Sequence, residues 1–159
     1  MDDNSRVVLL VDDEAAIRRL VRSALAGLDC EVIEAGDGPE AISLFKQYEN
    51  RIALLVTDVV MPGMHGDELA ILLTGLHPEL PVLFVSAYYQ QIQPSVQHFQ
   101  CFAKPFHPAA LARRVAEILD SGGKLGRDFT HGYERFSSWH QGNRALCHPC
   151  ASYPGSLAR

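Results

Sequence analysis

Two features are missing from this sequence of 159 residues, namely a long apolar run and a basic opening. Its unbroken apolar stretches are far shorter than the roughly 18 residues that a helix needs to cross a membrane. The first five residues include two aspartates, whereas a secretory signal begins with basic residues. Positive charge is not in excess either, because 14 Lys and Arg stand against 19 Asp and Glu. These absences argue against a membrane protein, a secreted protein or a direct nucleic-acid binder, and they predict a cytoplasmic protein.

Cysteine is also scarce, with 4 residues in the chain. Cys30 and Cys101 lie in apolar stretches, and Cys147 and Cys150 form a Cys-x-x-Cys pair near the C-terminus. Disulfide frameworks are typical of shorter, secreted chains, so we expect reduced thiols here. A chain of this length with 47% apolar residues can bury a core without such cross-links. The sequence therefore predicts one main globular domain.

The charge is distributed unevenly along the chain. Residues 1–121 carry 9 basic and 17 acidic side chains, whereas residues 122–159 carry 5 basic and 2 acidic ones. The second segment also holds 6 of the 12 glycines. We therefore predict a folded domain over 1–121 and a Gly-rich basic tail over 122–159 that stays flexible. A zinc site at Cys147 and Cys150 is the alternative for the tail, but a second ligand pair at the usual spacing is missing from the sequence.

Short apolar runs alternate with helix-period stretches across the predicted domain. Unbroken runs of this kind are typical of strands covered on both faces, as in parallel sheets. Five such alternations predict a doubly wound α/β fold with a parallel sheet. The segment 88–98 fits least well, because it is polar, glutamine-rich and interrupted by Pro94, so any helix there is short or kinked. The candidate strands cover residues 7–11, 30–34, 52–57, 81–85 and 99–103.

Polar side chains stand at the ends of four of these runs. Ligands of such sheets bind beyond the C-terminal ends of the strands, so these side chains form the candidate site. Their chemistry matches that position, since the set combines carboxylates, a hydroxyl and an ammonium group. The residues are Asp12 and Asp13, Asp58, Ser86, and Lys104.

The composition of this set points to phosphoryl chemistry. Three carboxylates at one edge repel one another unless a cation lies between them, and a small open cluster of their oxygens suits Mg²⁺. Lys104 and Ser86 can neutralise and hydrogen-bond a phosphoryl group beside the metal. Asp58 is the candidate nucleophile, because Asp12 and Asp13 form a metal-binding pair whereas Asp58 stands alone. Each residue by itself is more often a helix cap or a surface side chain, and only the joint pattern favours a site.

The same pattern resembles the receiver domain of bacterial two-component response regulators. The resemblance covers about residues 6–121, and it is specific because the strand ends carry the matching residues in the matching order. It rests on Asp12-Asp13, on Asp58 followed by Met61-Pro62-Gly63 and Gly66, on Ser86-Ala87, and on Lys104-Pro105-Phe106.

The resemblance implies a flavodoxin-like fold, with a five-stranded parallel sheet of order 2-1-3-4-5 and five helices. It also implies a site. Asp13, Asp58 and the backbone carbonyl of Val60 would hold Mg²⁺, with Asp12 acting through water. Lys104 and Ser86 would contact the phosphoryl oxygens. The peptide bond between Lys104 and Pro105 would be cis, a form that is nearly confined to bonds preceding proline.

The function implied by the resemblance is that of a single-domain response regulator. Asp58 would accept a phosphoryl group from a histidine kinase or a histidine phosphotransfer protein, and the altered surface would favour a downstream protein target. The domain would promote only its own phosphorylation and dephosphorylation, so it would not be an enzyme with turnover on a separate substrate. Neither nucleic acid nor a membrane is an expected direct partner.

One departure from the family pattern and two rival functions remain. Cys101 stands where the family usually has an aromatic switch residue, three positions before the lysine, and we expect it to act as a small buried hydrophobe rather than a redox sensor. A phosphorylation-independent interaction module is one rival function. A haloacid-dehalogenase-like phosphatase is the other, but that family places its Asp-x-Asp nucleophile on the first strand, whereas here the acidic pair Asp12-Asp13 comes first.

Overall fold

The computed structural model describes residues 5–87 and 99–122 of the chain. Strands and helices alternate along these residues, as the sequence predicts. Each candidate strand is found, with its ends within one residue of the expected position. The strands are β1 (Val7–Val11), β2 (Glu31–Ala35), β3 (Ile52–Thr57), β4 (Val82–Ser86) and β5 (Gln100–Ala103), and the helices are α1 (Ala15–Leu25), α2 (Gly38–Tyr48), α3 (Gly66–Leu76) and α4 (Pro108–Asp120).

The strands form one fully parallel sheet of order β2-β1-β3-β4-β5. The predicted doubly wound α/β fold and the strand order implied by the resemblance are therefore confirmed. Four helices lie within the described residues, whereas the resemblance implies five. The fifth would fall between β4 and β5, where residues 88–98 lie outside the described part of the chain. The bond between Lys104 and Pro105 is cis, as implied.

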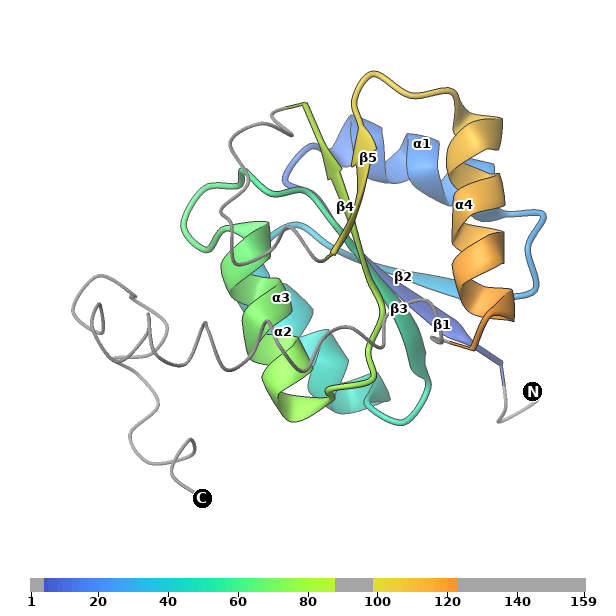
Figure 1. Cartoon of the computed structure of the whole chain (residues 1–159). Helices are drawn as coiled ribbons and strands as arrows, with labels where there is room; N and C mark the ends of the chain where they lie inside the picture. The colour runs from blue at the N-terminus through green and yellow to red at the C-terminus, as the bar shows by residue number, and fades with distance from the viewer. Residues whose placement is uncertain (1–4, 88–98, 123–159) are drawn as a thin grey trace, which may run out of the picture.

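Helices cover both faces of the sheet (Figure 1). α1 and α4 pack against each other on one face, and α2 and α3 pack on the other. The interior strand β1 contributes to both layers, since Leu9 and Val11 join the α2/α3 cluster whereas Val8 and Leu10 join the α1/α4 cluster. Burial on both sides explains why this strand is an unbroken apolar run rather than an alternating one.

Short connections hold the C-terminal strand ends close to the helices that follow. The carboxylate of Asp37 caps α2 by accepting a hydrogen bond from the backbone N–H of Glu40 over 2.8 Å. Nδ1 of His107 caps α4 in the same way, accepting from the backbone N–H of Ala109 over 3.3 Å. These caps fix where α2 and α4 begin and therefore keep the strand-end loops short.

The boundary after α4 stays a prediction, because residues 123–159 lie outside the described part of the chain. The core of the described residues runs from Val7 to Leu119. We therefore expect deletion of 123–159 to lower the melting temperature by less than about 5 °C, the shift that roughly 1 kcal/mol causes in a domain of this size. Thermal unfolding measures this. Ile118→Ala is the positive control, because it empties a buried core position and should cost about 2–4 kcal/mol. A larger drop on deletion would mean that the tail packs on the domain.

Candidate functional site

The candidate site lies at the C-terminal edge of the sheet, where the neighbouring strands β1 and β3 end. Asp12 follows β1, Asp58 follows β3, and Lys104 follows β5 on the far side of β4. The parallel ladder continues into the site, since the backbone N–H of Asp58 donates to the carbonyl oxygen of Val11 over 3.0 Å. The fold thus gathers residues that are distant in sequence, with Lys104 lying 92 positions from Asp12 and 46 from Asp58.

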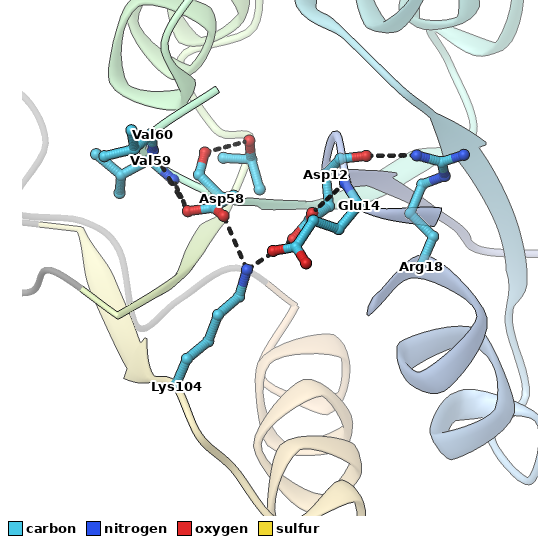
Figure 2. Close-up of polar contacts among 8 residues, drawn as sticks. Asp12, Glu14, Arg18, Asp58, Val59, Val60 and Lys104 are labelled. Carbon is cyan, nitrogen blue, oxygen red and sulfur yellow. Dashed lines mark hydrogen bonds and ion pairs between the residues drawn. The ribbon is translucent and has the colours of Figure 1, made fainter. Parts of the chain in front are cut away.

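Lys104 bridges two carboxylates (Figure 2). Its Nζ donates hydrogen bonds to Oδ2 of Asp12 over 2.9 Å and to Oδ2 of Asp58 over 2.8 Å. The side chains of Asp12, Asp58 and Lys104 are only 3%, 12% and 13% exposed. Burial by itself lowers the pKa of Lys104, but hydrogen bonds and charge from both aspartates outweigh it and leave the pKa raised. The lysine is therefore charged at neutral pH and neutralises part of the acidic cluster.

Three carboxylates converge at this edge and have the chemistry of a Mg²⁺ site. Asp12, Asp13 and Asp58 each offer an oxygen, and these atoms all lie within 4.8 Å of one another. Asp12 is buried, Asp58 is half-buried and Asp13 is exposed, so the cluster opens to solvent on one side. Mg²⁺ binds few carboxylates and keeps several waters, which such a cluster allows. One ammonium group against three carboxylates also leaves negative charge to attract a cation.

The backbone around Asp58 holds its carboxylate in place. Oδ1 of Asp58 accepts hydrogen bonds from the backbone N–H groups of Val59 over 2.6 Å and Val60 over 3.3 Å. Thr57 is fully buried, and its Oγ1 donates to the carbonyl oxygen of Asp58 over 2.9 Å. The backbone of Val60 therefore lies beside the acidic cluster, where the resemblance expects its carbonyl to bind the metal. Its side chain is 46% exposed.

Gly66 begins α3 directly against this loop. A Cβ atom built on Gly66 would overlap the carbonyl oxygen of Asp58 and would lie 2.9 Å from Oγ1 of Thr57. The backbone N–H of Gly66 donates to the carbonyl oxygen of Val59 over 2.8 Å. The absence of a side chain at this position therefore lets α3 and the Asp58 loop come into backbone contact.

Ser86 and Cys101 lie on the β4 and β5 side of the site. Ser86 is fully buried at the end of β4, and its carbonyl oxygen accepts from the backbone N–H of Lys104 over 3.0 Å. Cys101 is half-buried beside Phe84 and packs against the α2/α3 cluster. Burial raises the pKa of the Cys101 thiol, so the reactive thiolate is disfavoured. Both findings support the interpretation of Cys101 as a small hydrophobe.

Sequence reasoning missed two residues that contact the site. Thr57 ends a buried strand and is not distinguished from any other β-branched strand residue by its spacing. Arg18 has the spacing of a polar position on the amphipathic helix α1, yet its Nη1 donates to the carbonyl oxygen of Asp12 over 2.6 Å (Figure 2). The Arg18 contact depends on how α1 docks against the sheet, which no local pattern encodes.

Within residues 5–87 and 99–122, no helix is long and apolar enough to span a bilayer, the longest being α4 with 13 residues.

A family model described as the response regulator receiver domain matches residues 8–116, which is more than half of the chain. The matched range contains all the candidate site residues, from Asp12 to Lys104.

Individual relatives agree with this match. The sensor kinase CckA of Brucella abortus is 36% identical over 120 residues, covering 73% of this chain but only 13% of the kinase. The regulatory protein VanRB of Enterococcus faecalis is 32% identical over 145 residues, covering 88% of this chain and 63% of the regulator. This chain thus spans only part of the length of these relatives.

Among solved structures, the receiver domain of the hybrid histidine kinase CckA is similar with a TM-score of 0.62 and 34% identity. The similarity covers 71% of this chain and 98% of that domain. The shared region is thus nearly a whole receiver domain. Sequence, fold and strand-end residues all agree: the chain belongs to the receiver-domain family of two-component response regulators.

Proposed function

We propose that Asp58 accepts a phosphoryl group from a histidine kinase or a histidine phosphotransfer protein in a Mg²⁺-dependent reaction. The observation that carries this proposal is the arrangement at the strand ends. A half-buried carboxylate lies within hydrogen-bond distance of a half-buried ammonium group and within 4.8 Å of two further carboxylates. A nucleophile, a counter-charge and a metal-binding pair are thus present together.

The two oxygens of Asp58 suit different roles in this reaction. Oδ1 is held by the backbone N–H groups of Val59 and Val60, so it orients the carboxylate. Oδ2 contacts Lys104 and is the oxygen that attacks phosphorus, while the bond from phosphorus to the donor imidazole breaks and the imidazole leaves with the electron pair. Lys104 then moves its hydrogen bond from Oδ2 to a phosphoryl oxygen. Asp13, Asp58 and the backbone carbonyl of Val60 would hold Mg²⁺, which would supply further neutralisation of the phosphoryl charge.

In this role the chain is a switch and not an enzyme with turnover. Its cytoplasmic partners are the phosphodonor protein and a downstream protein target that distinguishes the phosphorylated surface. Ser86 contacts the phosphoryl group in this proposal, and its backbone bond to Lys104 couples β4 to β5 at the site. The rivals are an interaction module that needs no phosphorylation and a phosphatase of the haloacid dehalogenase type.

Incubation with a small-molecule phosphodonor and Mg²⁺ separates the three functions. A stable adduct of about 80 Da on the intact protein indicates an acyl phosphate on the receiver. Continuous phosphate release over many turnovers indicates a phosphatase. The absence of any reaction, with and without a histidine phosphotransfer protein, indicates an interaction module and overturns the proposal.

Removing the exposed carboxylate of the cluster tests the metal part of the proposal. We expect Asp13→Ala to weaken Mg²⁺ binding by about tenfold or more, because the ion loses a direct carboxylate ligand. Metal titration by calorimetry measures this. Glu14→Ala is the matched control, because it removes an exposed carboxylate next to Asp13 in the sequence. The hydrogen bond from Glu14 to Asp12 comes from the backbone N–H, which the substitution keeps. Equal Mg²⁺ affinities for wild type and Asp13→Ala would exclude Asp13 as a ligand.

The lifetime of the phosphorylated state should depend on side chains near the path of the attacking water. Val60 is apolar and 46% exposed beside Asp58, so it excludes water without orienting it. Tyr88 lies outside the described residues, and from its place two residues after Ser86 in the sequence we expect its large side chain to cover the phosphoryl group. We expect wild-type decay over minutes or longer, and Val60→Asn with Tyr88→Glu to shorten it about tenfold, a barrier change of about 1.4 kcal/mol. Loss of label after donor removal measures it, and a double variant that decays no faster contradicts this role.

A further inference from the structure

Arg18 reaches the acidic cluster from α1 and is anchored at both ends of its guanidinium group. Nη1 donates to the backbone carbonyl oxygen of Asp12 over 2.6 Å, and Nε lies 3.4 Å from Oε2 of Glu34 on β2 (Figure 2 shows the first contact). The side chains of Arg18 and Glu34 are only 20% and 22% exposed. A charge-assisted hydrogen bond in this shielded position is stronger than a contact on the open surface.

The atom that Arg18 binds determines the orientation of the peptide between Asp12 and Asp13. The carbonyl oxygen of Asp12 belongs to the planar peptide that joins Asp12 to Asp13, so the position of this oxygen fixes the orientation of the peptide plane. The other polar atoms of Asp12 have partners of their own, since its N–H donates to Ala35 and its carboxylate accepts from Glu14 and Lys104. Arg18 thus supplies the contact that holds the peptide group leading into Asp13.

We propose that Arg18 is a positioning residue for the metal site. It holds the Asp12–Asp13 peptide so that the exposed carboxylate of Asp13 turns toward Asp58, and it thereby sets the affinity of the cluster for Mg²⁺. This inference rests on the proposed metal-dependent function. Side chains that orient metal ligands from outside the coordination sphere typically change metal affinity by about 10- to 100-fold.

The positive charge of Arg18 acts in the opposite direction to its positioning role. A cation near a Mg²⁺ site weakens metal binding, but Glu34 pairs with the guanidinium and offsets this charge. Arg22, one turn further along α1, shares the same carboxylate, with its Nη1 3.1 Å from Oε1 of Glu34. Removal of Arg18 therefore has a diagnostic sign. Loss of charge alone would tighten Mg²⁺ binding, whereas loss of positioning weakens it.

Calorimetric Mg²⁺ titration of the full chain, without any phosphodonor, tests the inference. We expect the Kd of Arg18→Gln to rise about tenfold. Arg18→Lys keeps the positive charge and a hydrogen-bond donor group, so its Kd for Mg²⁺ should fall between those of the wild type and Arg18→Gln. Arg22→Gln is the matched control, because Arg22 contacts Glu34 but has no hydrogen bond to Asp12 among the described contacts, and its Kd should stay within about twofold of wild type. At saturating Mg²⁺ the phosphorylation rate of Arg18→Gln should return to that of wild type.

The possible outcomes distinguish the role of Arg18 from the proposed metal-dependent function. An unchanged or lower Kd for Arg18→Gln overturns the role of Arg18 and leaves the proposed function standing. A wild-type chain that binds no Mg²⁺ overturns the metal part of the proposed function. Thermal unfolding without metal checks that Arg18→Gln is folded. If Arg18→Gln does not fold, Arg18→Lys is titrated in its place. A Kd of Arg18→Lys equal to that of the wild type then overturns the inference.

Discussion

Asp58→Asn should abolish phosphorylation of the chain and leave it folded. A neutral amide of nearly the same shape is a poor nucleophile, so we expect the rate to fall by at least about a thousandfold, or about 4 kcal/mol of barrier. The fold should tolerate the change. The amide oxygen can still accept from the backbone of Val59 and Val60, and Lys104 keeps its bond to Asp12. Intact mass after incubation with a small phosphodonor and Mg²⁺ gives the extent of labelling.

The matched control for this variant is Asp37→Asn. It removes one carboxylate from the N-cap of α2, where asparagine caps as well as aspartate does, and it leaves the strand-end cluster unchanged. Its labelling should equal that of the wild type. Wild-type labelling of Asp58→Asn would place the phosphoryl group on another residue and would sink the assignment of the nucleophile.

Gly66→Ala should be the most damaging single substitution that adds only a methyl group near the site. The new Cβ would overlap the carbonyl oxygen of Asp58 and lie 2.8 Å from its carbonyl carbon, and neither backbone atom can rotate away as a side chain could. Either α3 or the Asp58 loop must move. We expect a loss of at least about 2 kcal/mol in the free energy of unfolding, with slower phosphorylation of the folded protein. Chemical denaturation and the labelling rate measure the two effects.

The same helix provides an internal control of opposite sign. Gly75 lies near the end of α3, and a Cβ built there meets nothing within 4 Å. Because alanine is a better helix former than glycine, Gly75→Ala should stabilise the chain by about 0.5–1 kcal/mol and leave labelling unchanged. Equal stability changes at Gly66 and Gly75 would show that helix propensity, and not the contact with Asp58, decides the effect.

The sequence predicts the sheet well because the interior strands β1, β3 and β4 are largely buried on both faces. A strand such as β1 packs against helices on either side, which requires a continuous apolar run, and that run ends where the polar strand-end residues begin. The gathering of Asp12, Asp13, Asp58 and Lys104 follows from parallel topology alone, since strands of one direction end at one edge. The order of the strands came from the family resemblance and not from the pattern.

What could not be predicted are contacts made across the fold by side chains with ordinary local roles. Arg18 lies on a helix whose polar positions all have similar spacing, so its bond to the Asp12 carbonyl depends on how α1 docks. The requirement for glycine at position 66 arises from a backbone approach between α3 and the Asp58 loop. A sequence pattern describes one helix or strand at a time, whereas each of these contacts depends on how a helix packs against another segment.

The distance of Lys104 from Asp12 along the chain has a consequence for synthesis. The two residues that share a hydrogen bond are 92 positions apart, and Lys104 directly follows β5, the last strand within residues 5–87 and 99–122. At about 5–20 residues per second, the ribosome needs some seconds to add the 46 positions from Asp58 to Lys104. During that interval the carboxylate of Asp58 lacks its ammonium partner, so the phosphoacceptor site that we propose is incomplete on a nascent chain. The proposed phosphoacceptor site is therefore complete only once β5 and Lys104 have been made.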